Sequence, residues 1–106
     1  MLTFVESVLF SSQVYDYLTD DEYGEFQAYL SAQPNKGDVV RGSGGVRKVR
    51  WKRAGSGKSG GVRILYYART DKGEIWLLLI YAKSARETIP GPLLKRIKQE
   101  MEDADV

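Results

Sequence analysis

The chain has 106 residues, 42% of them hydrophobic, which is the size of a single domain with one buried core. It contains no histidine and no cysteine, so disulfides, thiolate metal sites and catalytic pairs built on a histidine base are excluded. The formal net charge is only +2, and it conceals a very uneven distribution of acids and bases along the chain.

The N-terminal part of the chain predicts a short strand followed by two helices. Residues 2–5 are strand-forming, and residues 7–18 carry apolar side chains at helical spacing. These apolar residues are Val8, Leu9, Val14, Tyr15 and Leu18. Thr19 and Glu22 have the spacing of a capping box, which starts a second helix that ends at residues 34–37. One face of that helix carries Tyr23, Phe26, Tyr29 and Leu30.

The rest of the chain changes to the period of two that is typical of strands. After a loop at residues 37–45, we expect three strands joined by short connections, the first of them a glycine-rich hairpin loop at 54–61. The strands are expected at residues 46–53, 62–68 and 74–83. A final helix after residue 92 has an apolar stripe made of Leu93, Leu94, Ile97 and Met101.

These elements predict one α+β domain that spans residues 1–106, in the order β-α-α-β-β-β-α. Its sheet is small, twisted and mainly antiparallel, and the two N-terminal helices cover one of its faces. The longest apolar run, residues 75–82, is far shorter than the roughly 20 residues of a membrane helix. Residues 1–7 lack the basic and then apolar pattern of a signal peptide. We therefore expect a soluble, cytoplasmic protein without a membrane partner.

The acids and bases fall into separate blocks of sequence. Residues 1–40 carry seven acids and one base, Lys36. Residues 39–70 carry no acid and nine bases: Arg41, Arg47, Lys48, Arg50, Lys52, Arg53, Lys58, Arg63 and Arg69. A solvated surface is one interpretation of such a block. A block this long and this pure favours a site for a polyanion.

Strand alternation predicts which of these bases lie together. In residues 62–69, Val62, Ile64, Tyr66 and Ala68 form the core face, and Arg63, Leu65, Tyr67 and Arg69 form the other. Lys48, Arg50 and Lys52 share a face of the preceding strand, and Leu77, Leu79, Tyr81 and Lys83 share a face of the following one. A suitable register would bring Arg63, a base of the neighbouring strand, Tyr81 and Lys83 onto one concave surface.

Arginine, lysine and tyrosine without histidine suit one reaction class, the cleavage of RNA by its own 2′-hydroxyl. The protein then has to align that hydroxyl, stabilise charge on the phosphate and protonate the leaving 5′-oxygen. Arginine clamps phosphate in a bidentate manner, lysine crowded by cations can act as acid or base, and tyrosine stacks on bases. Tyr67 and Tyr81 could equally be half-buried packing residues, and Trp51 and Trp76 are expected to pack rather than to stack on RNA.

Several segments together resemble HigB-type toxins of the RelE/ParE superfamily. They include Phe4-Val-Glu-Ser, Leu18-Thr-Asp-Asp-Glu-Tyr, Gly42-Ser-Gly-Gly-Val-Arg-Lys-Val-Arg, Gly57-Lys-Ser-Gly-Gly-Val-Arg-Ile-Leu-Tyr-Tyr and Leu78-Leu-Ile-Tyr-Ala-Lys. The resemblance extends from residue 4 to about residue 100. It implies a RelE-like fold and the toxin half of a type II toxin–antitoxin module.

The resemblance also implies an activity, partners and a site. Such toxins enter the ribosome and cut mRNA there without a metal or other cofactor, and their partner is a cognate antitoxin, often of the helix-turn-helix type. Combining the resemblance with the faces above, the candidate catalytic residues are Arg63, Lys58, Tyr81 and Lys83. The candidate RNA-binding residues are Arg47, Lys48, Arg50, Lys52, Arg53 and Tyr67. The C-terminal segment offers Arg86, Lys95 and Arg96 but no tyrosine, so the general acid and base stay unassigned.

Two alternative functions stay open at this point. The same superfamily includes ParE-like proteins that inhibit DNA gyrase by binding and cut nothing. A toxin that has lost its activity and only binds RNA or the antitoxin would show the same sequence pattern.

Overall fold

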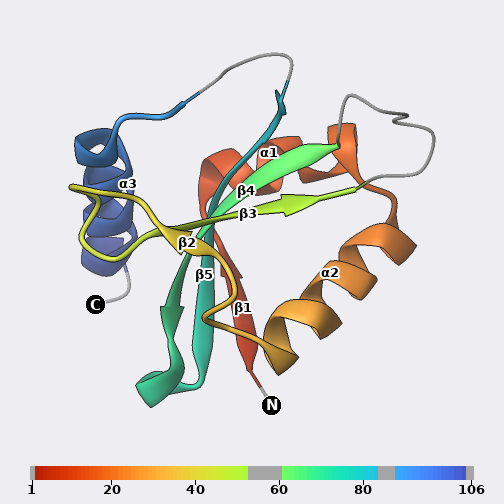
Figure 1. The fold of residues 1–106 in the computed structure, drawn as a ribbon. Helices are drawn as coiled ribbons and strands as arrows, with labels where there is room; N and C mark the ends of the chain where they lie inside the picture. The colour runs from red at the N-terminus through yellow and green to blue at the C-terminus, as the bar shows by residue number, and fades with distance from the viewer. Residues whose placement is uncertain (1, 53–60, 84–87, 105–106) are drawn as a thin grey trace.

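One five-stranded mixed sheet carries helices on both of its faces (Figure 1). The computed structural model describes residues 2–52, 61–83 and 88–104. In chain order the elements are β1 (Thr3–Glu6), α1 (Val8–Tyr17), α2 (Asp20–Ala32), β2 (Asp38–Val39), β3 (Arg47–Trp51), β4 (Val62–Arg69), a 3-10 turn (Thr70–Lys72), β5 (Glu74–Ala82) and α3 (Gly91–Ala104). The α+β class that the sequence predicts is confirmed. Among the described residues, no helix is both long and apolar enough to cross a lipid bilayer.

The strand order in the sheet is β1-β5-β4-β3-β2. β2 to β5 form an antiparallel meander, whereas β1 pairs with β5 in parallel and closes the other edge. β2 was not expected, because the sequence predicts a loop from residue 37 to residue 45. This strand has only two residues, and it exists because Asp38 and Val39 pair with Lys48 and Arg47. Because pairing with β3 defines this strand, the sequence of residues 38–39 alone hardly indicates it.

Both N-terminal helices begin at side-chain caps. The Ser7 hydroxyl accepts a hydrogen bond of 2.9 Å from the Phe10 amide and donates one of 2.7 Å to the Leu78 carbonyl, so it also ties α1 to β5. At α2 the predicted capping box is confirmed. The Glu22 amide donates to the Thr19 hydroxyl at 3.1 Å, and the Thr19 amide donates to the Glu22 carboxylate at 2.9 Å.

The buried face of α1 includes only some of the apolar residues that occur at helical spacing. Phe10, Val14 and Leu18 are buried, at the (i, i+4, i+8) spacing of one helix face. Val8, Leu9 and Tyr15 are exposed. The cap at Ser7 sets the rotation of the helix, because its hydroxyl is held by β5. The spacing of apolar residues in the sequence does not reveal this hydrogen bond between Ser7 and Leu78.

Two separate hydrophobic cores lie on the two faces of the sheet. α1 and α2 cover the first core, which includes Phe26, Ile64 and Tyr66. α3 covers the second core, which includes Leu65, Trp76 and Leu94. Figure 1 shows α2 and α3 on opposite sides of the sheet. The alternation predicted for β4 is therefore confirmed, and its second face is also covered in part. In α3, Leu94 and Ile97 are buried as predicted, but Leu93 is 42% exposed.

An irregularity in the pairing of β4 with β5 overturns one further prediction. Leu65 is opposite Leu79, but Tyr66 is opposite Leu77, so β5 has an extra residue at Leu78. This bulge reverses the facing of the residues that follow it. Leu77 consequently belongs to the core under α1 and α2, whereas Tyr81 belongs to the core under α3. The prediction from the sequence pattern that Leu77 and Tyr81 share a face is therefore wrong.

Candidate nucleic-acid interface

Three predicted site residues form one row across three strands on the sheet face that α3 covers, here called the α3 face. Arg50 of β3 is directly opposite Arg63 of β4, and Arg63 is directly opposite Tyr81 of β5. Directly opposed residues of antiparallel strands have Cα atoms about 4.5–5.5 Å apart, so their side chains lie close together. The convergence of Arg63, a base of the neighbouring strand and Tyr81 is therefore realised, and the base is Arg50.

The opposed arginines place two positive charges on directly paired residues of the sheet. Like charges directly across a strand pair destabilise a sheet, by an amount of the order of 0.2–1 kcal/mol. Arg50 is exposed and Arg63 is half-buried. An anion held between the two guanidinium groups would remove this repulsion. Phosphate matches the bidentate geometry of guanidinium and is suited to that position.

Three lysines surround this row. Lys48 precedes Arg50 by two residues on the same face of β3, and its opposite partner on the edge strand is Asp38. Lys52 directly follows β3 and is exposed. Lys83 directly follows β5 and is also exposed, and its backbone amide donates to the Gly61 carbonyl at 3.5 Å. The ends of β3, β4 and β5 thus carry bases on three adjacent strands.

Tyr81 forms the floor of this surface rather than its exposed part. Its side chain is 8% exposed, and its hydroxyl oxygen is buried. It belongs to the same core as Ile89 and Leu94. In this conformation the ring packs in the core under α3 and is not presented for stacking on a nucleotide base.

Arg47, a predicted RNA-binding residue, lies on the opposite face of the sheet. It pairs with Tyr66 across β3 and β4. Its guanidinium donates hydrogen bonds to the carbonyl oxygens of Asn35 at 3.1 Å and Gly37 at 2.8 Å. The Tyr66 hydroxyl adds a bond to the Pro34 carbonyl and accepts one from the Gly37 amide. Arg47 therefore holds the turn between α2 and β2, and the structure does not bring it to the basic row.

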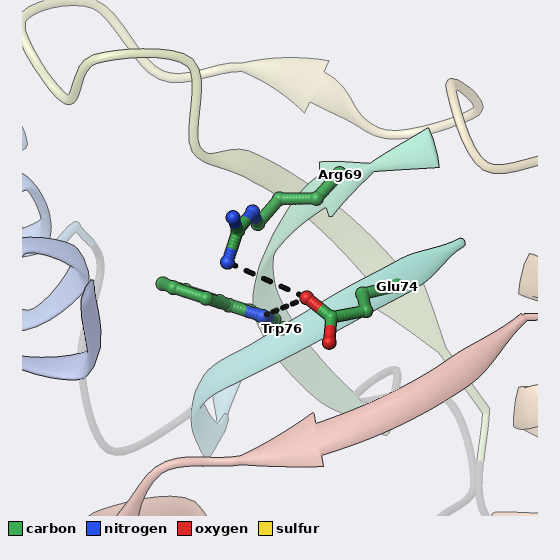
Figure 2. A network of polar contacts seen from close by, with 3 residues as sticks. All are labelled: Arg69, Glu74 and Trp76. Atoms are coloured by element: carbon green, nitrogen blue, oxygen red, sulfur yellow. Dashed lines mark hydrogen bonds and ion pairs between the residues drawn. The ribbon is translucent and has the colours of Figure 1, made fainter. Parts of the chain in front are cut away.

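Tyr67, another predicted RNA-binding residue, lies on the α3 face but is covered. The Lys98 ammonium lies 4.3 Å from the centre of its ring, and the ring contacts Trp76 edge to face. Trp76 in turn lies 4.3 Å below the Arg69 guanidinium, and its indole donates to Glu74, which also pairs with Arg69 at 3.4 Å (Figure 2). Trp76 is thus a packing residue, as the sequence indicates.

Trp51 also packs, against α2 on the other face of the sheet. Its ring lies 5.3 Å from Phe26 and 5.2 Å from Tyr29, measured between ring centres. The contact holds the end of β3 on α2. This end of the strand carries Arg50 on its other face, so α2 supports the basic row from behind.

The remaining predicted site residues, Lys58 and Arg53, lie outside the described residues, as do Arg86 and most of the glycine-rich loop. Within residues 2–52, 61–83 and 88–104, no group of three or more acidic residues is placed to hold a metal ion.

The sequence only partly indicated that lysines of α3 lie beside the loop at residues 41–45. Lys98 donates to the Gly44 carbonyl at 2.8 Å, and a Cβ atom placed on Gly44 would also meet the side chain of Lys95. Gly44 therefore lies beside Lys95 and Lys98 of α3, and the Arg41 carbonyl lies at the start of the helix, close to Gly91. The clue in the sequence was the set of three glycines at positions 42, 44 and 45. All three have positive φ angles, and such a loop packs closely against a helix.

The chain thus forms a small α+β domain, and the row of Arg50, Arg63 and Tyr81 crosses β3, β4 and β5 near one end of these strands. The chain matches no protein-family model.

Proposed function

We propose that this protein is the toxin of a type II toxin–antitoxin module and acts as a ribosome-dependent mRNA endonuclease that inhibits translation. The observation that carries the proposal is the direct opposition of Arg50 and Arg63, with Lys48 on the same strand and Lys52 and Lys83 directly after β3 and β5. Two guanidinium groups on directly paired residues suit the bidentate binding of a phosphate. The resemblance of the sequence to HigB-type toxins supports the same activity.

In the proposed reaction, the RNA supplies its own nucleophile. The 2′-hydroxyl attacks the adjacent phosphorus, and the bond to the 5′-oxygen breaks, leaving a 2′,3′-cyclic phosphate and a 5′-hydroxyl. Arg63 and Arg50 stabilise the charge that builds up on the phosphate oxygens, and Lys48 and Lys52 bind the flanking backbone. The candidates for the general acid and the general base are Lys83, Lys58 and Tyr81. Since the hydroxyl of Tyr81 is buried, Lys83 and Lys58 are tested first.

The proposal includes the partners and the place of action. The ribosome and its mRNA form the target, and a cognate antitoxin, of the helix-turn-helix type, controls the toxin. A ribosome-dependent activity requires the protein to act in the cytoplasm. The proposed chemistry uses side chains of the protein and the RNA alone, with no cofactor.

The test is induced expression in a bacterial host, followed by transcriptome-wide mapping of mRNA 5′ ends. Wild type is compared with Arg63→Ala and with Lys72→Ala, a matched removal of an exposed base on the 3-10 turn. Growth arrest with new cuts inside translated frames is expected for wild type and Lys72→Ala. Arg63→Ala is expected to lose about 10²–10³ in rate, the cost of removing one donor that stabilises the transition state.

The same experiment separates the alternatives. Arrest without new mRNA ends, together with a loss of DNA supercoiling, would replace the nuclease with a ParE-like gyrase inhibitor. Normal growth with intact expression would leave a protein that only binds RNA or an antitoxin. If Arg63→Ala stayed fully toxic, the basic row would not be the site.

A further inference from the structure

A second candidate binding surface lies between the N-terminal edge of the sheet and the C-terminal half of α3. It is a groove of about 360 Å³ whose walls come from the junction of β1 and α1, from Trp76 of β5, and from α3. Most of its lining is apolar, including Val5, Ile97 and Met101. The polar residues of the lining are Ser7, Glu6 and Glu100. Neither Arg50 nor Arg63 takes part in it.

Large apolar side chains at one end of the groove are exposed to water. Val8 is 87% exposed and Leu9 is 48% exposed, and both line the groove at the first turn of α1. Burial of one such side chain is worth about 1.5–3 kcal/mol, so their exposure is unfavourable for the isolated chain. Apolar residues in a concave, partly covered surface are typical of a site for a partner's side chains.

The charges around the groove specify the chemistry of that partner. No lysine or arginine is among the described residues that line the groove, although Lys98 follows Ile97 in the sequence and the Arg69 guanidinium lies 4.3 Å from the centre of the Trp76 ring. Glu6 and Glu100 lie in the lining, and Glu102 and Asp103 follow on α3. The carboxylate of Glu6 accepts hydrogen bonds from the hydroxyls of Ser11 and Tyr23, which hold it in place. Two acids without a base among the described lining residues oppose nucleic acids and anionic lipid surfaces and favour a cationic partner.

The placement of charge along α3 supports a functional role for these acids. The bases of α3, which are Lys95, Arg96 and Lys98, precede its acids, and there is no base in its last turn. This order opposes the helix dipole, which favours acids at the N-terminus and bases at the C-terminus, each by about 0.3–1 kcal/mol. A partner bound at the acidic end of α3 would account for this arrangement, which by itself weakens the helix.

We propose that this groove is the docking site for an amphipathic segment of a partner protein, with apolar side chains inserted at Val8, Leu9 and Met101 and lysine or arginine side chains facing Glu6 and Glu100. The proposal is independent of the function of the basic row. It also means that a partner can hold this protein while Arg50 and Arg63 stay uncovered.

The test uses fluorescence anisotropy with a defined probe, a short fluorescein-labelled amphipathic helix of leucine and lysine, and a matched helix of leucine and glutamate. The groove variants are Val8→Ser and Glu100→Lys. Each has a control of the same chemistry elsewhere: Val39→Ser on the edge strand β2, and Glu25→Lys on α2, both at exposed positions. Thermal unfolding followed by circular dichroism checks that each variant folds.

We expect the leucine–lysine helix to bind and the leucine–glutamate helix to bind at least about tenfold more weakly. Val8→Ser and Glu100→Lys should each weaken binding by about fivefold or more, and the controls by less than about twofold. Equal binding of both helices, or equal effects of groove and control variants, would overturn the proposal. So would a concentration-dependent dimer, seen by sedimentation and abolished by Val8→Ser, since a second copy of the chain would then be the occupant.

Discussion

Arg50 and Arg63 are direct partners across the β3–β4 ladder, and the next residue in the same row is Tyr81. Two guanidinium groups in this position repel one another, and a neutral residue at either site would relieve the repulsion. This repulsion is what a phosphate bound between the two groups would remove.

Replacing Arg50 by threonine should separate the two effects. We expect Arg50→Thr to raise the free energy of unfolding by about 0.2–1 kcal/mol, since the like-charge pair is gone and threonine suits a strand. RNA cleavage should fall by about tenfold or more, because a charged hydrogen bond to phosphate is worth roughly 1.5–3 kcal/mol. Urea unfolding and 5′-end mapping measure the two quantities. A variant that is less stable than wild type, with unchanged cleavage, would contradict this account of the pair.

Arg47 and Lys48 are neighbours in sequence on opposite faces of β3, and they should behave in opposite ways. Arg47→Met should lower the free energy of unfolding by about 1–3 kcal/mol, because the carbonyl oxygens of Asn35 and Gly37 lose their donor. Its RNA affinity should not change. Lys48→Met should lower the salt dependence of RNA binding, the slope of log K against log salt, by about 0.7. Titrations at several salt concentrations test this, and a reduced slope in Arg47→Met would place that residue on the RNA after all.

Two glycines make a matched test of packing. A Cβ atom on Gly91, at the start of α3, would lie 2.0 Å from the Arg41 carbonyl oxygen, whereas a Cβ atom on Gly24, inside α2, would meet nothing within 4 Å. Gly91→Ala should therefore destabilise the protein by about 1–3 kcal/mol. Gly24→Ala should stabilise it by about 0.5–1 kcal/mol, since glycine is a poor helix former. Thermal unfolding of both variants decides, and equal shifts in the same direction would refute the close contact at Gly91.

The hydroxyl of Tyr23 donates to the carboxylate of Glu6 and joins α2 to β1. Burial, this hydrogen bond and the charge of Glu6 raise the pKa of Tyr23 far above its ordinary value of 10.0. The folded state thus holds the phenol proton more tightly than the unfolded state does. The stabilisation is complete below pH 10 and is lost as the pH rises above it.

Tyr23→Phe should accordingly flatten the alkaline part of the stability curve. At neutral pH the variant should be less stable by about 1–3 kcal/mol, because Glu6 loses a donor. Between neutral pH and about pH 11 its stability should fall less than that of wild type, although burial also raises the pKa of Tyr66, which continues to contribute. Urea unfolding across this range measures the difference, and parallel curves for the two proteins would show that Tyr23 does not carry the effect.

Local patterns were sufficient for much of the fold. The capping box at Thr19 and Glu22 predicted the start of α2, and the alternation in β4 predicted that Arg63 and Ile64 face opposite sides of the sheet. Both depend on the backbone geometry of a few consecutive residues, which the sequence specifies directly. The buried side of α1 could not be predicted in the same way, because a hydrogen bond from Ser7 to Leu78, 71 residues away, sets the rotation of the helix.

The sequence by itself thus determined the class of the fold, the segregation of acids and bases, and the set of residues from which a basic site could be built. Only the tertiary structure decided which of them meet. It set Arg50 opposite Arg63, used a bulge in β5 to bring Tyr81 to the same face and covered Tyr67 with α3. The physical reason is that strand register and helix docking depend on packing between segments far apart in the chain, and local periodicity carries no information about that packing.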